Sequence, residues 1–108
     1  ARLAKAALDR REIAAAAKLS AYSFRTKQGK EKKLESTDWL LDSASADGFE
    51  ALGGKTGYTE QAGYCFVGRF RDKSGRSVIV AVLDTGGKNE RFRQARALAS
   101  WAFNYCQW

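Results

Sequence analysis

The stretch of this sequence with the clearest chemical potential is Gly53-Gly54-Lys55-Thr56-Gly57-Tyr58-Thr59-Glu60. At its centre a cation, a hydroxyl and a glycine follow one another. Lys-Thr-Gly alone is a weak signal, because a tripeptide of common residues arises often by chance. Its setting is more informative: it stands at the start of a predicted strand, and Ala62-Gly63-Tyr64-Cys65 begins a second one. This placement makes the stretch the first candidate for a functional site.

Several kinds of chemistry are excluded by composition. The 108 residues include no histidine, so the chain has no Ser-His-Asp or Cys-His catalysis, no histidine metal site and no imidazole pH switch. Cys65 and Cys106 are too few for a zinc ribbon or a disulfide-dense scaffold. Two buried, reduced thiols and one disulfide remain as alternatives, and a disulfide would require an exported protein.

The charge balance is basic, with 19 Lys and Arg against 12 Asp and Glu and a net charge of +7. Such a balance suits nucleic acid, an anionic membrane surface or an acidic substrate. Disorder is excluded by a hydrophobic content of 44%. The length suits one domain, yet the sequence begins Ala-Arg-Leu and contains no Met, so we expect a processed or excised piece.

The first half of the chain predicts two helices and a hairpin. Residues 1–19 are rich in helix formers, and Asp9 followed by Glu12 is typical of a capping box between two short helices. Strands over 20–26 and 31–36, joined by a turn at 27–30, form a strongly basic hairpin. Tyr22 and Phe24 alternate along it as core residues do. A short apolar anchor at 39–41 and an irregular segment at 43–54 follow.

The second half predicts two strands and a closing helix. Residues 62–71 place Tyr64, Phe66 and Phe70 on one face, and a turn at 72–75 leads into 77–83, which is apolar on both faces like a central strand. Asn89 caps the last helix, whose apolar stripe is Phe92, Ala95, Ala99, Ala102, Phe103 and Cys106. The fold class is therefore α+β, an antiparallel sheet covered by helices, with Cys65 and Cys106 both in the layer between sheet and final helix.

The whole sequence resembles the serine D-alanyl-D-alanine carboxypeptidases, the low-molecular-mass penicillin-binding proteins. The resemblance runs over essentially all 108 residues but covers only the later part of that family's catalytic domain. It is carried by the first helix, the segment Ala21-Tyr22-Ser23-Phe24, the stretch Gly54-Lys55-Thr56-Gly57-Tyr58-Thr59, the segment Ala62-Gly63-Tyr64-Cys65, and the helix containing Arg93-Gln94-Ala95-Arg96-Ala97-Leu98. It implies a β-lactamase or transpeptidase-like fold.

The sequence departs from this family in two ways. Leu52 stands where the family usually has Asp before Lys-Thr-Gly, and Asp38 corresponds most nearly to the Asn that precedes a Leu-Leu pair. More importantly, no serine has a lysine three residues later or an asparagine two residues later, so the motifs Ser-x-x-Lys and Ser-x-Asn are missing. We therefore expect residues 1–108 to be the C-terminal portion of the catalytic domain, with the acyl-accepting serine and its base elsewhere.

The resemblance implies roles for the Lys-Thr-Gly strand. Lys55 would serve the substrate's anionic end and the proton network of the serine, Thr56 would bind the terminal carboxylate, and Gly57 would let the peptide approach. The backbone N–H of Tyr58 would be one oxyanion-hole donor. The implied reaction removes the terminal D-Ala of peptidoglycan stem peptides through an acyl-serine, which β-lactams also form. No cofactor or metal is expected, and the isolated chain is expected to be inactive.

The resemblance also places the protein outside the cytoplasm, in the periplasm or cell envelope, with peripheral membrane association of the parent protein as an open option. That oxidising compartment favours a disulfide between Cys65 and Cys106. The alternative function is a non-catalytic, basic interaction module for a polyanion or the cell wall, carried by the hairpin lysines Lys27, Lys30, Lys32 and Lys33. We favour a solvated hairpin whose lysines protect a strand edge, and expect no nucleic-acid partner.

Overall fold

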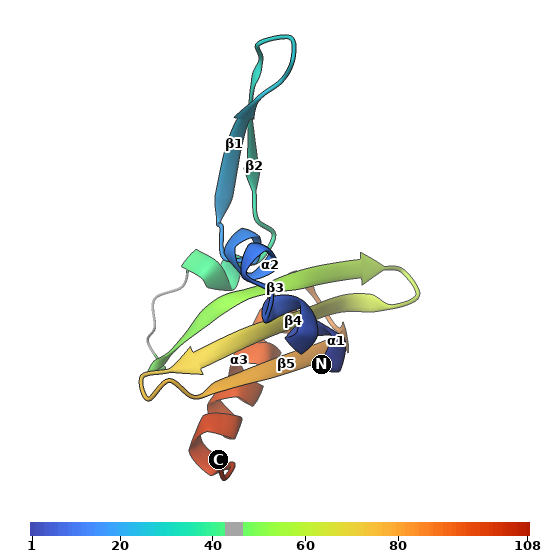
Figure 1. The fold of residues 1–108 in the computed structure, drawn as a ribbon. Helices are drawn as coiled ribbons and strands as arrows, with labels where there is room; N and C mark the ends of the chain where they lie inside the picture. The colour runs from blue at the N-terminus through green and yellow to red at the C-terminus, as the bar shows by residue number, and fades with distance from the viewer. Residues whose placement is uncertain (43–46) are drawn as a thin grey trace.

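A three-stranded antiparallel sheet forms the centre of the structure, a computed structural model that describes residues 1–42 and 47–108 (Figure 1). The predicted α+β class is confirmed. The helices are α1 (Arg2–Leu8), α2 (Arg11–Ala17), the 3₁₀ turn η1 (Trp39–Asp42) and α3 (Lys88–Tyr105); the strands are β1 (Ala21–Arg25), β2 (Glu31–Glu35), β3 (Phe49–Thr59), β4 (Gly63–Asp72) and β5 (Ser77–Thr85). Of the predicted irregular segment 43–54, residues 43–46 lie outside the described residues, and β3 already begins at Phe49.

Helices cover the sheet on both sides (Figure 1). α3 packs on β4 and β5, whereas α1 contacts β4 and α2 contacts β3. Successive residues of β4 point to opposite faces. Phe66 is buried and its ring meets that of Phe92 of α3 at 5.3 Å, while Val67 lines the groove beneath α1 and α2. The main core lies on the α3 side.

The strand order is β3-β4-β5, so β4 is the central strand and β5 is an edge of the described sheet. The prediction that residues 77–83 form the central strand is wrong. Val80 and Val82 are buried beneath α3, but Leu83 on the opposite face is 77% exposed. The apolar residues on both faces of β5 therefore reflect one packed face and one face left open in this chain.

The N-terminal helices are tied to the sheet by Arg69 of β4. Its guanidinium donates to the Leu8 carbonyl oxygen at 3.1 Å and to an Asp9 carboxylate oxygen at 2.5 Å. A cation at the C-terminal end of α1 also complements the helix dipole. The predicted capping box is wrong, because Asp9 ends α1 and α2 has no side-chain cap at Arg10.

A bulge in β3 lets α2 approach the sheet. The register with β4 shifts between Ala51 and Gly53, and Gly53 has a φ of 132°. A Cβ built there would lie 2.9 Å from the backbone of Ala17 at the end of α2. Only glycine fits this conformation and this contact without strain. The bulge directly precedes Lys-Thr-Gly, so it helps to fix the position of that segment against α2.

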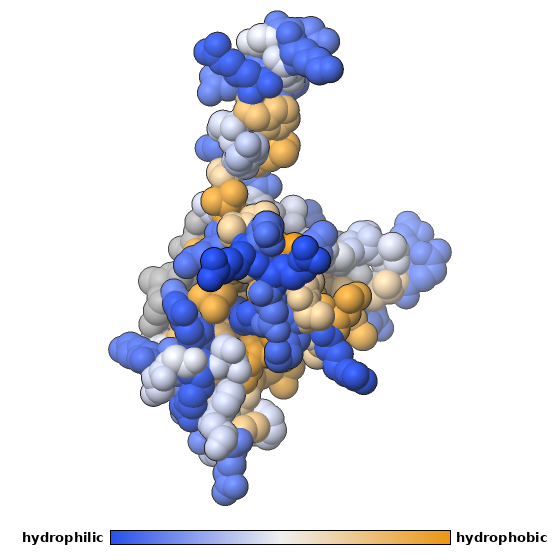
Figure 2. Space-filling model, viewed as in Figure 1, coloured by the Kyte–Doolittle hydropathy of each residue, from blue (hydrophilic) through white to orange (hydrophobic). Residues whose placement is uncertain are grey.

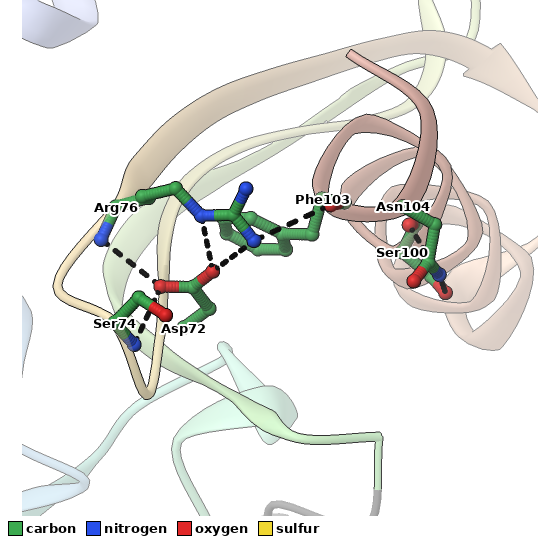
Figure 3. Close-up of polar contacts among 6 residues, drawn as sticks. All are labelled: Asp72, Ser74, Arg76, Ser100, Phe103 and Asn104. Atoms are coloured by element: carbon green, nitrogen blue, oxygen red, sulfur yellow. Dashed lines mark hydrogen bonds and ion pairs between the residues drawn. The ribbon is translucent and has the colours of Figure 1, made fainter. Parts of the chain in front are cut away.

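The C-terminal end of α3 is anchored to the β4–β5 turn (Figure 3). Arg76 donates from Nε to Asp72 at 2.7 Å and from Nη2 to the Phe103 carbonyl oxygen at 3.4 Å. Its guanidinium also lies 5.2 Å from the ring of Trp108, which stacks on Phe103. The helix begins at Lys88 with Gly87 as its N-cap, so the cap predicted at Asn89 is wrong.

The two cysteines are free, and the disulfide considered from the sequence is not formed. Cys65 lies near the start of β4, beside the end of the sheet at which α3 begins; Cys106 follows the far end of α3 and is exposed. A helix of 18 residues is about 27 Å long, whereas a disulfide needs Cα atoms within about 7 Å. The prediction that both cysteines share the layer between sheet and helix is therefore wrong.

The β1–β2 hairpin is confirmed, but its aromatic residues are not core residues. The hairpin projects from the body of the molecule, and every residue of both strands is exposed (Figure 1). Tyr22 is 57% and Phe24 39% exposed, with ring centroids 6.3 Å apart. Figure 2 shows hydrophobic side chains along the hairpin below a hydrophilic tip. Within the described part of the chain, no helix is long and apolar enough to span a bilayer.

Candidate functional site

The Lys-Thr-Gly segment lies on an edge strand and faces open space. β3 pairs only with β4 in the described sheet, so its other edge is free. Beside this segment is a hollow of about 710 Å³. Its lining comes from β3, β4, α3 and the segment that leads into η1: Thr37, Lys55, Thr56, Gly57, Tyr58, Tyr64, Lys88 and Arg91. The structure thus brings all four residues singled out from the sequence, 55–58, to one hollow.

Lys55 is exposed, and its ammonium group donates to the Thr56 carbonyl oxygen. The side chain therefore runs along its own strand at the mouth of the hollow. A lysine on the buried interior edge of the sheet would be inconsistent with a role in ligand binding, and that arrangement is not observed. An ammonium held at a free strand edge is available to an anionic ligand that lies beside the strand.

Thr56 is buried, and its hydroxyl forms a 2.6 Å hydrogen bond with the hydroxyl of Thr37. Thr37 directly precedes the buried Asp38, in the segment that leads into η1. This hydrogen bond fixes the rotamer of Thr56 and places two hydroxyl groups side by side at the wall of the hollow. Thr37 could not be predicted as a site residue from the sequence, because its partner Thr56 is 19 residues away and belongs to a different element.

The two glycines around Lys55 and Thr56 differ in the space beside them. A Cβ built on Gly54 would lie 2.3 Å from the Val67 carbonyl oxygen, whereas a Cβ on Gly57 would meet only Cys65, at 3.9 Å. Gly54 is therefore required by packing within the sheet. Gly57 is not, and its missing side chain leaves room for a ligand instead.

A stack of aromatic rings and a guanidinium forms the far wall. The rings of Tyr58 and Tyr64 stack at 4.3 Å, and the Arg91 guanidinium lies 5.7 Å from the Tyr64 ring and 4.9 Å from the Phe92 ring. Cation–π contacts of this kind orient a guanidinium without neutralising it. Thr85 supports the wall by donating to the Tyr64 carbonyl oxygen at 2.9 Å.

Arg91 is the functional candidate that the sequence analysis missed. It is 7% exposed, and Nη1 makes a long 3.5 Å contact with the Gly57 carbonyl oxygen. The buried Nε has no hydrogen-bond partner among the described side chains. A signal did exist in the sequence. β3 and β5 run in the same direction on either side of β4, so the start of α3 lies at the same end of the sheet as Gly57. A cation in the first turn of a helix opposes the helix dipole and often has another purpose.

Asp38 directly follows Thr37 in the chain. It is 4% exposed; one carboxylate oxygen accepts the Leu40 N–H at 3.1 Å, and the other, Oδ2, is buried without a partner. Burial raises the pKa of the Asp38 carboxyl above its ordinary value, while the Leu40 N–H and the charge of Arg91 act in the opposite direction. The carboxyl is therefore sensitive to the charge of Arg91.

The electrostatic character of the hollow is cationic. Lys55, Lys88 and Arg91 line it, and none of the lining residues that the structure describes carries a carboxylate. Such a site suits a carboxylate or another anion, with hydroxyl groups from Thr37 and Thr56 as further donors. Within residues 1–42 and 47–108, no group of three or more Cys, Asp or Glu side chains is placed to hold a metal ion. The chemistry that this arrangement supports is anion binding beside an extended strand.

The sequence and the fold of this chain were compared with those of known proteins. No family model and no curated protein sequence matches the chain. Among solved structures, it is similar to a variant of the Streptomyces K15 DD-transpeptidase, with 28% identity and a TM-score of 0.78, over 92% of this chain and 38% of that one. It is also similar to the D-alanyl-D-alanine carboxypeptidase of Mycobacterium tuberculosis H37Rv, with 28% identity and a TM-score of 0.75, over 93% of this chain and 37% of that one.

The predicted resemblance to the DD-peptidases is confirmed. A penicillin-binding protein homologue from Mycobacterium tuberculosis gives the same result, with 27% identity and a TM-score of 0.71 over 94% of this chain. The chain spans less than two fifths of the length of these structures and matches a C-terminal fragment of the DD-peptidase fold.

Proposed function

We propose that this chain forms one wall of a DD-peptidase active site, which removes the terminal D-Ala from peptidoglycan stem peptides and is acylated by β-lactams. The observation that carries the proposal is the meeting of Lys55, Thr56 and Gly57 with the buried cation Arg91 at one open hollow. The similarity to DD-peptidases supports the class of reaction. The proposal includes an extracytoplasmic location, where peptidoglycan is found.

In this proposal, the peptide lies beside β3 as an additional strand. The terminal carboxylate binds Thr56 and Arg91, because a buried guanidinium and an oriented hydroxyl together match its charge and its lone pairs. Gly57 leaves room for the peptide backbone. The Tyr58 N–H supplies one oxyanion donor, and the loss of such a donor costs about 3 kcal/mol of transition-state stabilisation.

The nucleophile comes from outside residues 1–108, since no Ser-x-x-Lys occurs in this sequence. We assign it to the remaining part of the same catalytic domain. The serine oxygen attacks the carbonyl carbon of the penultimate D-Ala, the amide bond breaks, and the terminal D-Ala leaves with a proton on its amine. Water then hydrolyses the acyl-serine ester. Lys55 stabilises the anionic groups of substrate and transition state throughout.

The half-site is tested by titrating the ¹⁵N-labelled chain with N-acetyl-D-Ala-D-Ala. We expect shifts confined to residues 55–58 and the Arg91 side chain, and none with the L,L dipeptide. Gly57→Ala should weaken binding about tenfold or more, because its Cβ occupies the space left for the peptide. Gly86→Ala is the matched control, since its Cβ would meet nothing within 4 Å. Equal responses to both dipeptides, or unchanged binding by Gly57→Ala, would contradict the proposal.

A second candidate, a basic interaction arm, is favoured by the exposure of the β1–β2 hairpin. Tyr22 and Phe24 of this hairpin are exposed, so they are not core residues. The cross-strand pairs Tyr22–Leu34 and Phe24–Lys32 put two aromatic rings, an apolar chain and a cation on one face. A linear anionic polymer would bind such a face through stacking and charge.

This arm is tested with inorganic polyphosphate. If the arm binds polyanions, affinity falls steeply with salt and is lost in the double variant Lys32→Ser/Phe24→Ser. The Lys73→Ser variant is the control, because Lys73 lies in the turn at the far end of β4. Binding that is insensitive to the hairpin substitutions assigns the affinity to net charge and rejects the second candidate.

A further inference from the structure

Arg91 is a buried cation. Among the side chains that the structure describes, which leave out those of residues 42–46, no carboxylate forms an ion pair with its guanidinium, and Nε is buried without a hydrogen bond. Buried charges are normally compensated, because the loss of hydration is costly. The two ring faces beside it supply only part of that compensation.

Asp38 presents the matching feature with the opposite charge. Its Oδ2 is buried without a hydrogen bond, while its Oδ1 is occupied by the Leu40 N–H. The two residues on either side of Asp38 both reach the region of Arg91. Thr37 bonds to Thr56 in the wall of the hollow, and the Trp39 ring lies 5.8 Å from the ring of Phe92.

We propose that Asp38 is a positioning residue for Arg91: its buried carboxylate compensates the guanidinium charge and so keeps the free donors of Arg91 available to the hollow. The inference deepens the proposed function, since it concerns the same anion site. Coulomb attraction between two desolvated groups is only weakly screened by solvent. The carboxylate therefore acts on the orientation of Arg91 although no direct bond joins them.

The charged groups around Asp38 leave few alternatives for this role. From α3, the group that acts on its titration is Arg91. From β3, Thr56 reaches the same segment through its bond with Thr37, and Lys55 of that strand directs its ammonium to the Thr56 carbonyl oxygen. Among the side chains that the structure describes, Asp38 is a buried acidic group whose pKa is raised by burial and lowered in part by the charge of Arg91.

The test follows the Nε–Hε signal of Arg91 by NMR in the 108-residue chain. In the wild type, this signal should shift with pH in a single step as Asp38 titrates, and the step should be absent in Asp38→Asn. Asparagine keeps an oxygen for the Leu40 N–H but removes the charge. The matched control is Asp47→Asn, which breaks a 2.6 Å ion pair between Asp47 and Arg96. Arg96 belongs to α3 like Arg91, and this substitution should leave the pH step of the Arg91 signal unchanged.

The link to ligand binding is read from N-acetyl-D-Ala-D-Ala affinity. Asp38→Asn should weaken binding about threefold or more, the low end of the coupling between neighbouring groups, while Asp47→Asn has no effect. If the wild-type Arg91 signal does not respond to the dipeptide at all, the proposed function is contradicted. The pH dependence of the same signal still tests the positioning role of Asp38 independently.

A flat Arg91 profile in the wild type, or the same step in Asp38→Asn, overturns the positioning role. The outcome does not depend on the variant folding. The ¹³Cγ signal of Asp38 in the wild type must titrate with the same midpoint as the Arg91 Nε–Hε signal, and two different midpoints would also reject the inference.

Discussion

Gly54 and Gly57 flank Lys55 and Thr56 directly in the sequence. Gly54 is required by packing within the sheet, whereas we propose that Gly57 makes room for the ligand. The sequence alone does not distinguish them, because both are glycines in the same short stretch, residues 53–60. The difference comes from β4. Gly54 faces the backbone of Val67 and Gly68, while the space beside Gly57 is open except for Cys65.

This contrast predicts different effects on stability. Gly54→Ala should lower the free energy of unfolding by about 1–3 kcal/mol, as overpacked interiors do, because the new Cβ overlaps backbone that has no room to move. Gly57→Ala should change it by less than about 0.5 kcal/mol. Urea unfolding followed by circular dichroism measures both. Equal destabilisation by the two substitutions would mean that Gly57 is also a packing residue.

Asp38 predicts a pH dependence with a definite sign. Its pKa is raised in the folded chain because of burial, so the folded state binds the proton more tightly than the unfolded state. The contribution of Asp38 to stability therefore falls as pH rises from the ordinary Asp value through the raised one, and is constant above it. Asp38→Asn should be at least as stable as the wild type at neutral pH.

The difference in unfolding free energy between wild type and Asp38→Asn, measured from pH 3 to 8, isolates this effect. Asp9, Asp72 and Glu90 have lowered pKa values, so their contributions to the free energy of unfolding decrease as pH falls. These contributions are the same in both proteins and cancel in the difference. A difference that does not vary with pH would show that Asp38 titrates alike in folded and unfolded chains.

At the scale of the elements, the turn at 72–75 and the β1–β2 hairpin were predicted from residue types within a few positions. The helix caps expected at Asp9 and Asn89 were wrong, and so were positions that depend on neighbouring elements. The place of β5 in the sheet could not be predicted, since an apolar strand at an edge and one at the centre have the same sequence pattern. For the same reason Tyr22 and Phe24 alternate like core residues, although both are exposed and no described residue buries them.

Arg76 predicts a local effect at the end of α3. In Arg76→Ala the bonds to Asp72 and Phe103 are lost, and the loss of the cation–π contacts alone costs about 0.5–1 kcal/mol. Amide hydrogen exchange should accelerate over Asn104–Cys106 and stay unchanged near Phe92, which packs on the sheet independently. Arg76→Lys keeps the charge but not the planar donors, so its amide exchange rates over this segment should lie between those of the wild type and Arg76→Ala. Uniform acceleration along α3 would contradict the anchor.

At the scale of the whole molecule, the candidate site could be predicted only in part. Residues 55–58 were found because they are contiguous in sequence and match a motif. Arg91, Thr37 and Asp38 were not, because they approach β3 from two other elements that only the fold brings together. The fold class could be predicted from the order of helices and strands. The positions of Cys65 and Cys106 could not, because they depend on the length and direction of α3.

The central claim is that this chain holds the Lys-Thr-Gly wall of a site whose nucleophilic serine lies in another part of the domain. Labelling with a fluorescent penicillin tests it directly, on the chain alone and after mixing with a polypeptide that supplies the Ser-x-x-Lys portion. We predict no label on the isolated chain, label on the serine of the added portion in the mixture, and loss of that label with Lys55→Ala. Label on the isolated chain, or a mixture that folds together and remains unlabelled, would contradict the account.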